Sequence, residues 1–413
     1  MANNTKKKGV GLAIDAGTTT LAFALVDLDT GGILKNISLP NPQKKWGDDV
    51  LSRVEAVVRD PLVLSSLQSS VVSAINSAIK GLGKREINEI TVAGNSCMEH
   101  LLLGISPVSF SRVPFRPLFK EAKRFKAKDI GIDAPKSALY TFPLIGGFIG
   151  GDTVAAILAL SLDKKKNALA IDIGTNSEIV LKAGSLLYAA SSAAGPAVEG
   201  GSISSGMAAG KGAIAGVKIT EDQLMLHVIG DVSPAGVCGS GLISAVSELL
   251  KAGMIDKSGR IKDKDEVSHN LSSRIKRFSE GNGFVLSRTA KKEIVLTQTD
   301  IRALQGAKAA LRAGLDTLLK KAGIKPEDVE EVYLAGAFGS NLDKYDLETI
   351  GVLDVCWLER LSQTGDSALD GAVMALIDEG KKKEAEAIAE TVGYVSLSGS
   401  PVFEKGFIRA MGF

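Results

Sequence analysis

Residues 13–20 read Ala-Ile-Asp-Ala-Gly-Thr-Thr-Thr, and residues 170–177 read Ala-Ile-Asp-Ile-Gly-Thr-Asn-Ser. Each stretch is an apolar run that ends in Asp-x-Gly-Thr, and the two aspartates, Asp15 and Asp172, lie 157 residues apart. A short apolar run without charges is typical of a buried strand, and glycine permits the tight turn after it. The repeat therefore predicts two β-hairpins with polar tips, one opening each half of the chain.

Each predicted tip has the chemistry of a phosphate-binding loop, because successive backbone N–H groups in a turn can surround phosphate oxygens. Asp15 and Asp172 are the predicted catalytic carboxylates and ligands of Mg²⁺, directly or through water, since Mg²⁺ takes few carboxylates plus phosphate and water oxygens. The alternatives are ordinary hairpin turns and strand-end carboxylates without a catalytic role. The predicted phosphate-binding residues are Gly17, Thr18, Thr19 and Thr20 in the first copy and Gly174, Thr175 and Asn176 in the second.

Composition narrows the class of protein. The 413 residues suffice for two or more domains, and a hydrophobic content of 45% with 23% charged residues is ordinary for a globular protein. A net charge of +2 with intermixed signs gives no electrostatic case for nucleic acid or an anionic membrane. No apolar run reaches the length of a membrane span, and the N-terminus lacks a signal peptide's apolar core, so a cytoplasmic location is expected. Cys97, Cys238 and Cys356 have no iron–sulfur spacing, so no iron–sulfur cluster is expected in this chain.

Strands that alternate with helices predict an α/β fold. A first lobe is expected over 9–163 and a second over 167–413, with the option that the C-terminal helix packs back on the first lobe. The expected elements are helical spacing over 49–82, a strand over 90–93, a short helix through 103, a Pro-containing surface excursion over 106–135, helices over 151–162, 239–253, 299–322 and 367–378, and a strand over 329–334.

The ordered motifs resemble a known superfamily. The two Asp-x-Gly-Thr stretches and Ala335-Gly-Ala-Phe-Gly resemble the phosphate and adenosine motifs of the actin, sugar-kinase and heat-shock-chaperone fold. Further blocks make the chain similar to the ATPase part of the reductive activators of corrinoid proteins. These blocks are Gly94-Asn-Ser, Gly150-Gly-Asp, Gly195-Pro-Ala-x-Glu-Gly, Gly236-x-Cys-Gly-Ser-Gly, Gln298-x-Asp-Ile-Arg-x-Leu-Gln and Gly365-Asp-Ser-Ala-Leu-x-Gly-Ala. The resemblance implies a two-lobed actin-like ATPase, with duplicated ribonuclease-H-like lobes around a nucleotide cleft.

The resemblance also assigns roles outside the hairpins. Asp152 either is a plain N-cap of a helix, or it positions or deprotonates the attacking water, as the corresponding carboxylate does across this superfamily. Glu199 and Ser202 are the predicted contacts to a partner protein, and close packing without partner contact is the alternative. Further nucleotide-binding residues are expected at Gly239, Ser240 and Gly241, where small residues fit a helix N-terminus close to a bound group, and at Gly336, Ala337 and Phe338 against the adenosine.

The implied reaction uses ATP and Mg²⁺ to return inactive Co(II) to Co(I) on a partner corrinoid protein. Relatives usually carry an iron–sulfur domain that supplies the electron, and this sequence shows none. Three alternatives follow. The chain is an excised ATPase piece, or a separate low-potential donor such as a ferredoxin-like or iron–sulfur protein supplies the electron. In the third alternative, the protein only remodels its partner and a free donor reduces the cobalt. Relatives suggest a homodimer. A small-molecule kinase of the same fold and an actin-like scaffold ATPase remain the alternative functions.

Overall fold

The computed structural model describes residues 9–83, 86–288 and 292–413. The chain forms two compact units. Unit 1 contains the described residues up to Ala168 together with Val180–Ala190 and Asp366–Ser396. Unit 2 contains Leu169–Ile179, Ser191–Gly365 and Leu397–Phe413. The chain therefore returns to unit 1 late in the sequence, and neither unit is one continuous stretch.

Unit 1 is built on a six-stranded sheet with the order β3-β2-β1-β4-β6-β5. The predicted first hairpin is present, because β1 and β2 are antiparallel, with Asp15 opposite Ala22. β1, β4 and β6 run parallel to one another, and β3 and β5 are antiparallel edge strands. The strands are β1 (Val10–Ala16), β2 (Thr20–Asp27), β3 (Ile33–Pro40), β4 (Ile87–Ala93), β5 (Lys123–Lys126) and β6 (Ala138–Thr141).

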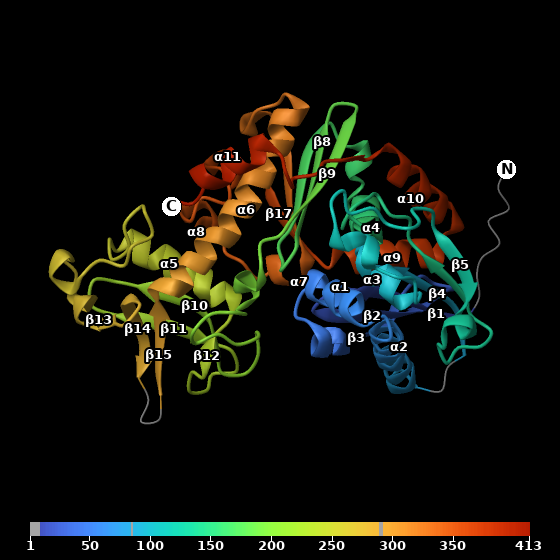
Figure 1. The fold of residues 1–413 in the computed structure, drawn as a ribbon, viewed down its shortest axis with the longest axis horizontal. Helices are drawn as coiled ribbons and strands as arrows, with labels where there is room; N and C mark the ends of the chain where they lie inside the picture. Colours follow the sequence, from blue (N-terminus) through green and yellow to red (C-terminus); the bar gives the residue numbers. More distant parts are fainter. Residues whose placement is uncertain (1–8, 84–85, 289–291) are drawn as a thin grey trace. The chain divides into compact units, whose positions relative to one another are not determined.

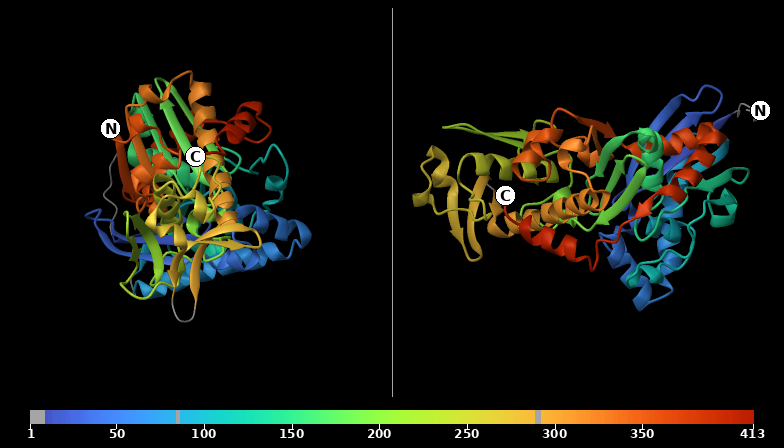
Figure 2. Two further views of the ribbon diagram at one scale, coloured as in Figure 1. Left: turned by 90° about the vertical axis from the view of Figure 1, so that its left-hand side faces the viewer. Right: turned by 90° about the horizontal axis from the view of Figure 1, so that it is seen from above.

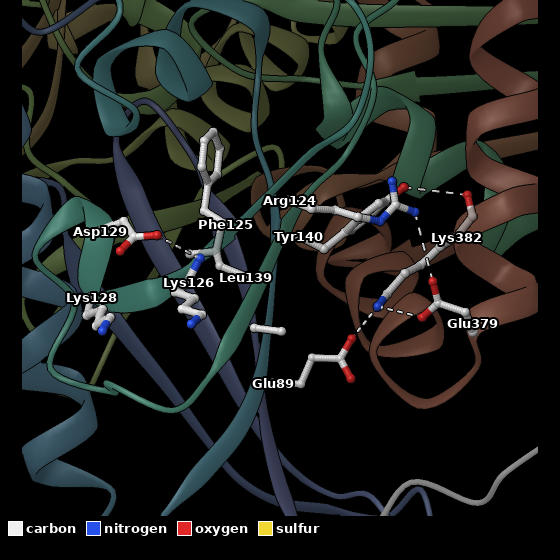
Figure 3. A pocket seen from close by; sticks show the side chains of 11 residues that line it. Glu89, Arg124, Phe125, Lys126, Lys128, Asp129, Leu139, Tyr140, Glu379 and Lys382 are labelled. Carbon is white, nitrogen blue, oxygen red and sulfur yellow. Dashed lines mark hydrogen bonds and ion pairs between the residues drawn. The ribbon is translucent and has the colours of Figure 1, made fainter.

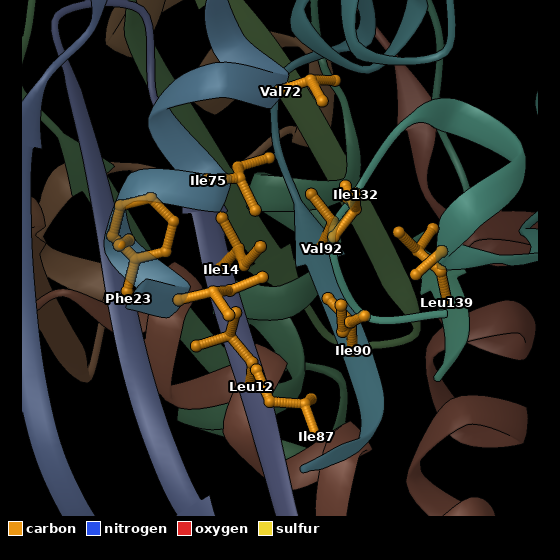
Figure 4. Close-up of a cluster of buried hydrophobic side chains, with 14 of the residues drawn as sticks. Leu12, Ile14, Phe23, Val72, Ile75, Ile87, Ile90, Val92, Ile132 and Leu139 are labelled. Atoms are coloured by element: carbon orange, nitrogen blue, oxygen red, sulfur yellow. The ribbon is translucent and has the colours of Figure 1, made fainter. Parts of the chain in front are cut away.

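Helices cover this sheet with apolar faces. Figure 4 shows Leu12 and Ile14 of β1 packed near Ile75 of α2, and all three side chains are fully buried. On the other side, α9 packs against β1 and α4, and a Cβ on Gly371 of α9 would lie 2.0 Å from the carbonyl oxygen of Ala155. Only glycine permits so close a helix crossing. The helices are α1 (Val50–Arg59), α2 (Val63–Gly81), α3 (Ser96–Leu102), α4 (Gly151–Leu160), α9 (Ser367–Ile377) and α10 (Glu379–Thr391).

Two predictions for unit 1 need refinement. The helical pattern over 49–82 is divided into α1 and α2, because Pro61 lacks an N–H and the Asp60 side chain accepts a hydrogen bond from the Leu62 N–H at the break. The excursion over 106–135 is largely irregular, as expected, but it also contributes β5 to the sheet.

A second six-stranded sheet has the order β17-β16-β7-β8-β9-β18, and its residues are divided between the two units. The second Asp-x-Gly-Thr copy lies between β7 and β8, as the repeat predicts. β16 and β17 are parallel. The strands are β7 (Asn167–Asp172), β8 (Ser177–Ala183), β9 (Leu186–Ser192), β16 (Glu331–Ala335), β17 (Leu361–Gly365) and β18 (Gly393–Tyr394).

Unit 2 also holds two three-stranded sheets and the longest helix of the described chain, α6 (Gln298–Ala322). Thr297 and Asp300 form a capping box that starts α6, and α11 lies against this helix (Figures 1 and 2). The other elements of unit 2 are β10 (Ala213–Ile219), β11 (Leu224–Val228), β12 (Gly236–Val237), β13 (Ile275–Phe278), β14 (Gly281–Arg288), β15 (Glu293–Thr297), α5 (Gly239–Lys251), α7 (Gly336–Gly339), α8 (Lys344–Thr349) and α11 (Pro401–Arg409). Among the helices of the described residues, none combines the length and apolar character needed to cross a membrane.

Candidate nucleotide-binding residues

The tip of the first hairpin, Gly17–Thr19, is fixed by side chains from other elements of unit 1. The Asn41 side chain donates to the Gly17 carbonyl at 2.9 Å, and the Arg53 guanidinium donates to the Thr18 carbonyl at 2.6 Å. Arg53 is fully buried, and this burial lowers its pKa to about 10, so the guanidinium remains charged at neutral pH. The tip is therefore held from beneath by a cation and an amide that the motif itself does not contain.

Asn95 connects this tip to α3. Its Nδ2 donates to Thr18 Oγ1 at 3.0 Å, while its Oδ1 accepts from the Met98 N–H at 2.9 Å and caps the helix. One side chain thus orients a predicted phosphate-binding hydroxyl and starts α3. The sequence marked Gly94-Asn-Ser as a family block, but the contact to Thr18 spans 77 residues and is visible only in the fold.

Asp152 lies in the first turn of α4, where Gly150 occupies the N-cap position. The plain N-cap interpretation of Asp152 is therefore wrong, because the cap position falls two residues earlier. Its Oδ1 accepts from the Thr153 N–H at 2.6 Å, and burial raises the pKa of Asp152 to about 6. A carboxylate with a pKa near the working pH is suited to accept a proton from water.

Glu99 on α3 is a buried carboxyl next to Asp152 that the sequence reasoning missed. It is fully buried, and within the described part of the chain neither carboxyl oxygen has a hydrogen-bond partner of good geometry. A Cβ on Gly151 would lie 2.2 Å from Glu99 Oε1. Only glycine at this position leaves room for the Glu99 carboxyl next to the first turn of α4. Burial raises the pKa of Glu99 well above its ordinary value, and the nearby Asp152 carboxylate adds to the rise. The available signal was Glu99 as the one acidic residue of α3, between Met98 and His100.

In unit 2, the tip of the second hairpin contacts Glu199. Glu199 Oε1 accepts hydrogen bonds from the Thr175 N–H at 2.7 Å and from Thr175 Oγ1 at 2.9 Å. Glu199 ends the short 3-10 segment η5 (Pro196–Glu199), and the Thr175 carbonyl accepts from the Gly195 N–H. The N–H and hydroxyl of Thr175 therefore donate together to one anionic oxygen, and the same two groups are able to donate to a phosphate oxygen.

Asp172 and the adenosine motif lie together. Gly336 has φ of +82°, and a Cβ there would lie 2.1 Å from Asp172 Oδ1, so only glycine leaves room for this carboxylate. Phe338 reaches the start of α5, since a Cβ on Gly239 would lie 2.9 Å from its ring and 1.7 Å from the Val198 carbonyl oxygen. Of Ala337, the structure describes only the backbone, within α7.

The start of α5 also borders a cavity of about 740 Å³ within unit 2. Ser240 lines this cavity together with Ser244, His227 and Asn341, which follows the adenosine motif. Gly241 has a different role: a Cβ there would lie 2.0 Å from the Ile214 carbonyl oxygen, so this glycine lets α5 pack on β10.

A second cavity of about 740 Å³ lies in unit 1, and Figure 3 shows its lining. Its central cation, Lys382, forms ion pairs with Glu89 and Glu379, and Arg124 pairs with Glu379 and Glu386. None of the predicted site residues lines it. The lining carries four basic side chains and three acidic ones, and because it contains no residue of either Asp-x-Gly-Thr tip or of the adenosine motif, we assign no nucleotide to it.

Ser202 is exposed and has φ of +55°, a left-handed conformation that is uncommon outside glycine. Its neighbours are fixed: the Ser204 N–H donates to Asp300 at 2.7 Å, and Ser205 Oγ accepts from the Val295 N–H. Ser202 is therefore exposed on a loop whose following residues are held by hydrogen bonds. Such backbone outliers occur preferentially at functional sites.

The carboxylates at the hairpins fit Mg²⁺ by their chemistry. Asp172 ends β7 and Asp15 is the next-to-last residue of β1. The described residues contain no group of three or more His, Cys, Asp or Glu side chains that could hold a metal by themselves. Mg²⁺ requires no such group, because one or two carboxylates with phosphate and water oxygens suffice.

Comparisons with known proteins place these features in one family. Residues 10–165 match the model of the RACo middle region, and residues 166–413 match the model of the C-terminal domain of RACo, the ASKHA domain. The chain belongs to the RACo family. The ASKHA domain is the actin-like ATPase fold, so the predicted family and fold class are confirmed.

Individual relatives agree over nearly the whole chain. The RACo-family chain is 33% identical over 420 residues to the corrinoid activation enzyme RamQ of Eubacterium limosum, covering 98% of this chain and 71% of RamQ. It is 27% identical over 464 residues to the Co(II) methylated amine-specific corrinoid protein reductase of Methanosarcina barkeri, covering 98% and 77%. A solved reductive activator for corrinoid, iron–sulfur protein superposes with a TM-score of 0.88 at 36% identity, covering 100% of this chain and 67% of that one.

Proposed function

We propose that this protein is a reductive activator that uses ATP to return Co(II) to Co(I) on a partner corrinoid protein. Family membership supports this proposal. The observation that carries the ATP part is the pair of hydrogen bonds from Thr175 to a carboxylate oxygen, because the same N–H and hydroxyl suit a phosphate oxygen.

The chain's own residues have distinct roles in hydrolysis. The N–H groups and hydroxyls of Gly17–Thr20 and Gly174–Asn176 bind phosphate oxygens and fix the phosphate to be cleaved. Asp152 accepts a proton from the attacking water, which its raised pKa permits near neutral pH. Asp15 and Asp172 are the carboxylates that would hold Mg²⁺, directly or through water, and the ion would supply neutralisation of phosphate charge. The adenosine is assigned to Gly336 and Phe338 by their motif, and Ser240 borders the cavity of unit 2.

The redox step needs one electron, and its balance is Co(II) plus one electron to Co(I). A separate low-potential donor, ferredoxin-like or another iron–sulfur protein, supplies that electron. Co(II) is a poor acceptor at cellular potentials, and for one electron about 59 mV changes the equilibrium tenfold. ATP makes the step favourable by changing the activator's affinity for the two cobalt states of its partner.

The partner contact lies at Ser202 and Glu199. Ser202 is exposed on the loop that follows η5, and Glu199 ends η5. By resemblance the protein works in the cytoplasm as a homodimer, which light scattering coupled to size exclusion tests.

The deciding experiment is an anaerobic visible spectrum of a Co(II) corrinoid protein with a low-potential donor. The Co(I) band should appear only when this protein and ATP are both present, and ADP should form at the same time. If the band develops equally without ATP or without this chain, the proposed function is wrong. A phosphorylated small molecule as the product would instead identify a kinase.

A further inference from the structure

The Glu199 carboxylate accepts hydrogen bonds from the Thr175 N–H and hydroxyl, the same groups that are predicted to bind phosphate. Both hydrogen bonds end on one oxygen, Oε1, at 2.7 Å from the Thr175 N–H and 2.9 Å from the hydroxyl. Thr175 is 7% exposed, so its donors have little access to water. Charge-assisted hydrogen bonds to a carboxylate are about twice as strong as neutral ones.

A carboxylate and a phosphate oxygen cannot occupy the same two donors together. They would also repel each other, because both are anionic and the site is largely shielded from water. Binding of a phosphate at Thr175 therefore requires Glu199 to leave.

The backbone on both sides of Glu199 is tightly packed. A Cβ on Gly239 would lie 1.7 Å from the carbonyl oxygen of Val198, which precedes Glu199. After Glu199 the chain turns at Gly200, which has φ of +85°, and a Cβ there would lie 2.6 Å from the Met207 carbonyl oxygen. Close-packed segments of this kind shift as a unit rather than deform gradually. The next segment carries the exposed Ser202.

We propose that Glu199 competes with the phosphate of ATP for the Thr175 donors, and that its displacement couples ATP binding to the loop over 200–205. This inference rests on the proposed function and adds its coupling element. Glu199 acts as a positioning residue: bound to Thr175 it holds η5, and once displaced it becomes available for the partner contact.

The test compares Glu199→Gln with Glu221→Gln, which removes the same charge from an exposed position of the same unit. The affinity for ATP is measured by equilibrium dialysis. Glu199→Gln should bind ATP about tenfold more tightly than the wild type, the factor expected when one charge-assisted competitor is weakened. Glu221→Gln should bind as the wild type does. If Glu199 only shapes the loop, its replacement weakens binding, so equal or weaker affinity of Glu199→Gln overturns the competition.

Hydrogen exchange of residues 196–205 gives a second readout that does not depend on turnover. ATP should increase exchange there in the wild type, and Glu199→Gln should show the faster exchange before ATP is added. Glu199→Ala, with its fold checked by circular dichroism, should behave in the same way. No effect of bound ATP on this segment overturns the coupling alone. A wild type that binds no ATP overturns the proposed function together with this inference, so the two failures are distinguishable.

Discussion

Replacement of Gly336 by alanine tests whether Asp172 and the adenosine motif act together. Gly336 has φ of +82°, and an added Cβ would lie 2.1 Å from Asp172 Oδ1. Gly323, which ends α6, offers a matched control in the same unit. Its φ is +70°, and an added Cβ there would meet nothing within 4 Å. Both substitutions impose the same backbone strain, and only one moves the carboxylate.

The expected magnitudes follow from these two geometries. Left-handed backbone costs a residue with a Cβ about 1–2 kcal/mol, so both variants should lose this much stability. Real Cβ atoms essentially never approach a neighbour within 3.0 Å. The Asp172 oxygen must therefore move by about 1 Å in Gly336→Ala, and a displacement of this size can reduce the rate about 100-fold, or about 2.7 kcal/mol.

The assay measures kcat/KM for ATP hydrolysis in the presence of the Co(II) partner, with thermal unfolding of both variants recorded in parallel. Gly323→Ala should melt a few degrees lower than the wild type and retain its ATPase activity. Gly336→Ala should fold, melt near the control and hydrolyse ATP about 100-fold more slowly. If the two variants have the same kcat/KM, Asp172 has no role in catalysis and the reasoning fails.

Three further predictions concern unit 1. Because only the ionised Asp152 accepts a proton, ATPase activity should fall as the pH drops through about 6, and Asp152→Asn should lose about 100-fold or more of kcat; a flat pH profile contradicts this role. The pKa of Glu99 is higher in the folded protein than in the unfolded chain. The protonated Glu99 therefore adds its full contribution to the free energy of unfolding below the ordinary pKa of a glutamate. That contribution is lost as the pH rises through the raised pKa of the folded protein. With rising pH, the Tm of Glu99→Gln should therefore increase relative to the Tm of the wild type, because glutamine does not ionise. A Tm difference that stays constant with pH would refute this prediction. Arg53→Lys loses the planar donors that hold Thr18 and should reduce the free energy of unfolding in urea by about 2–4 kcal/mol and raise the KM for ATP, whereas the exposed Arg59→Lys on the same helix should change neither.

Local sequence determined most of the secondary structure and both hairpins. An apolar run followed by Asp-x-Gly-Thr contains the strand, the turn and the polar tip within eight residues, so no distant contact is needed to form it. The start of α6 was readable for the same reason, because Thr297 and Asp300 cap it within one turn. The division of 49–82 into two helices could have been read from Pro61, whereas β5 exists only because β6 offers a partner.

From the sequence alone came the two Asp-x-Gly-Thr tips and the family, together with the prediction that the tips bind phosphate and Mg²⁺. The tertiary structure alone decided what surrounds them: Arg53 and Asn95 at Thr18, Glu99 beside Asp152, and Glu199 on Thr175. Each of these partners lies between 24 and 77 residues along the chain from the group beside it. Burial and close approach set their charges and hydrogen bonds, and both quantities depend on the packed fold rather than on neighbours in the chain.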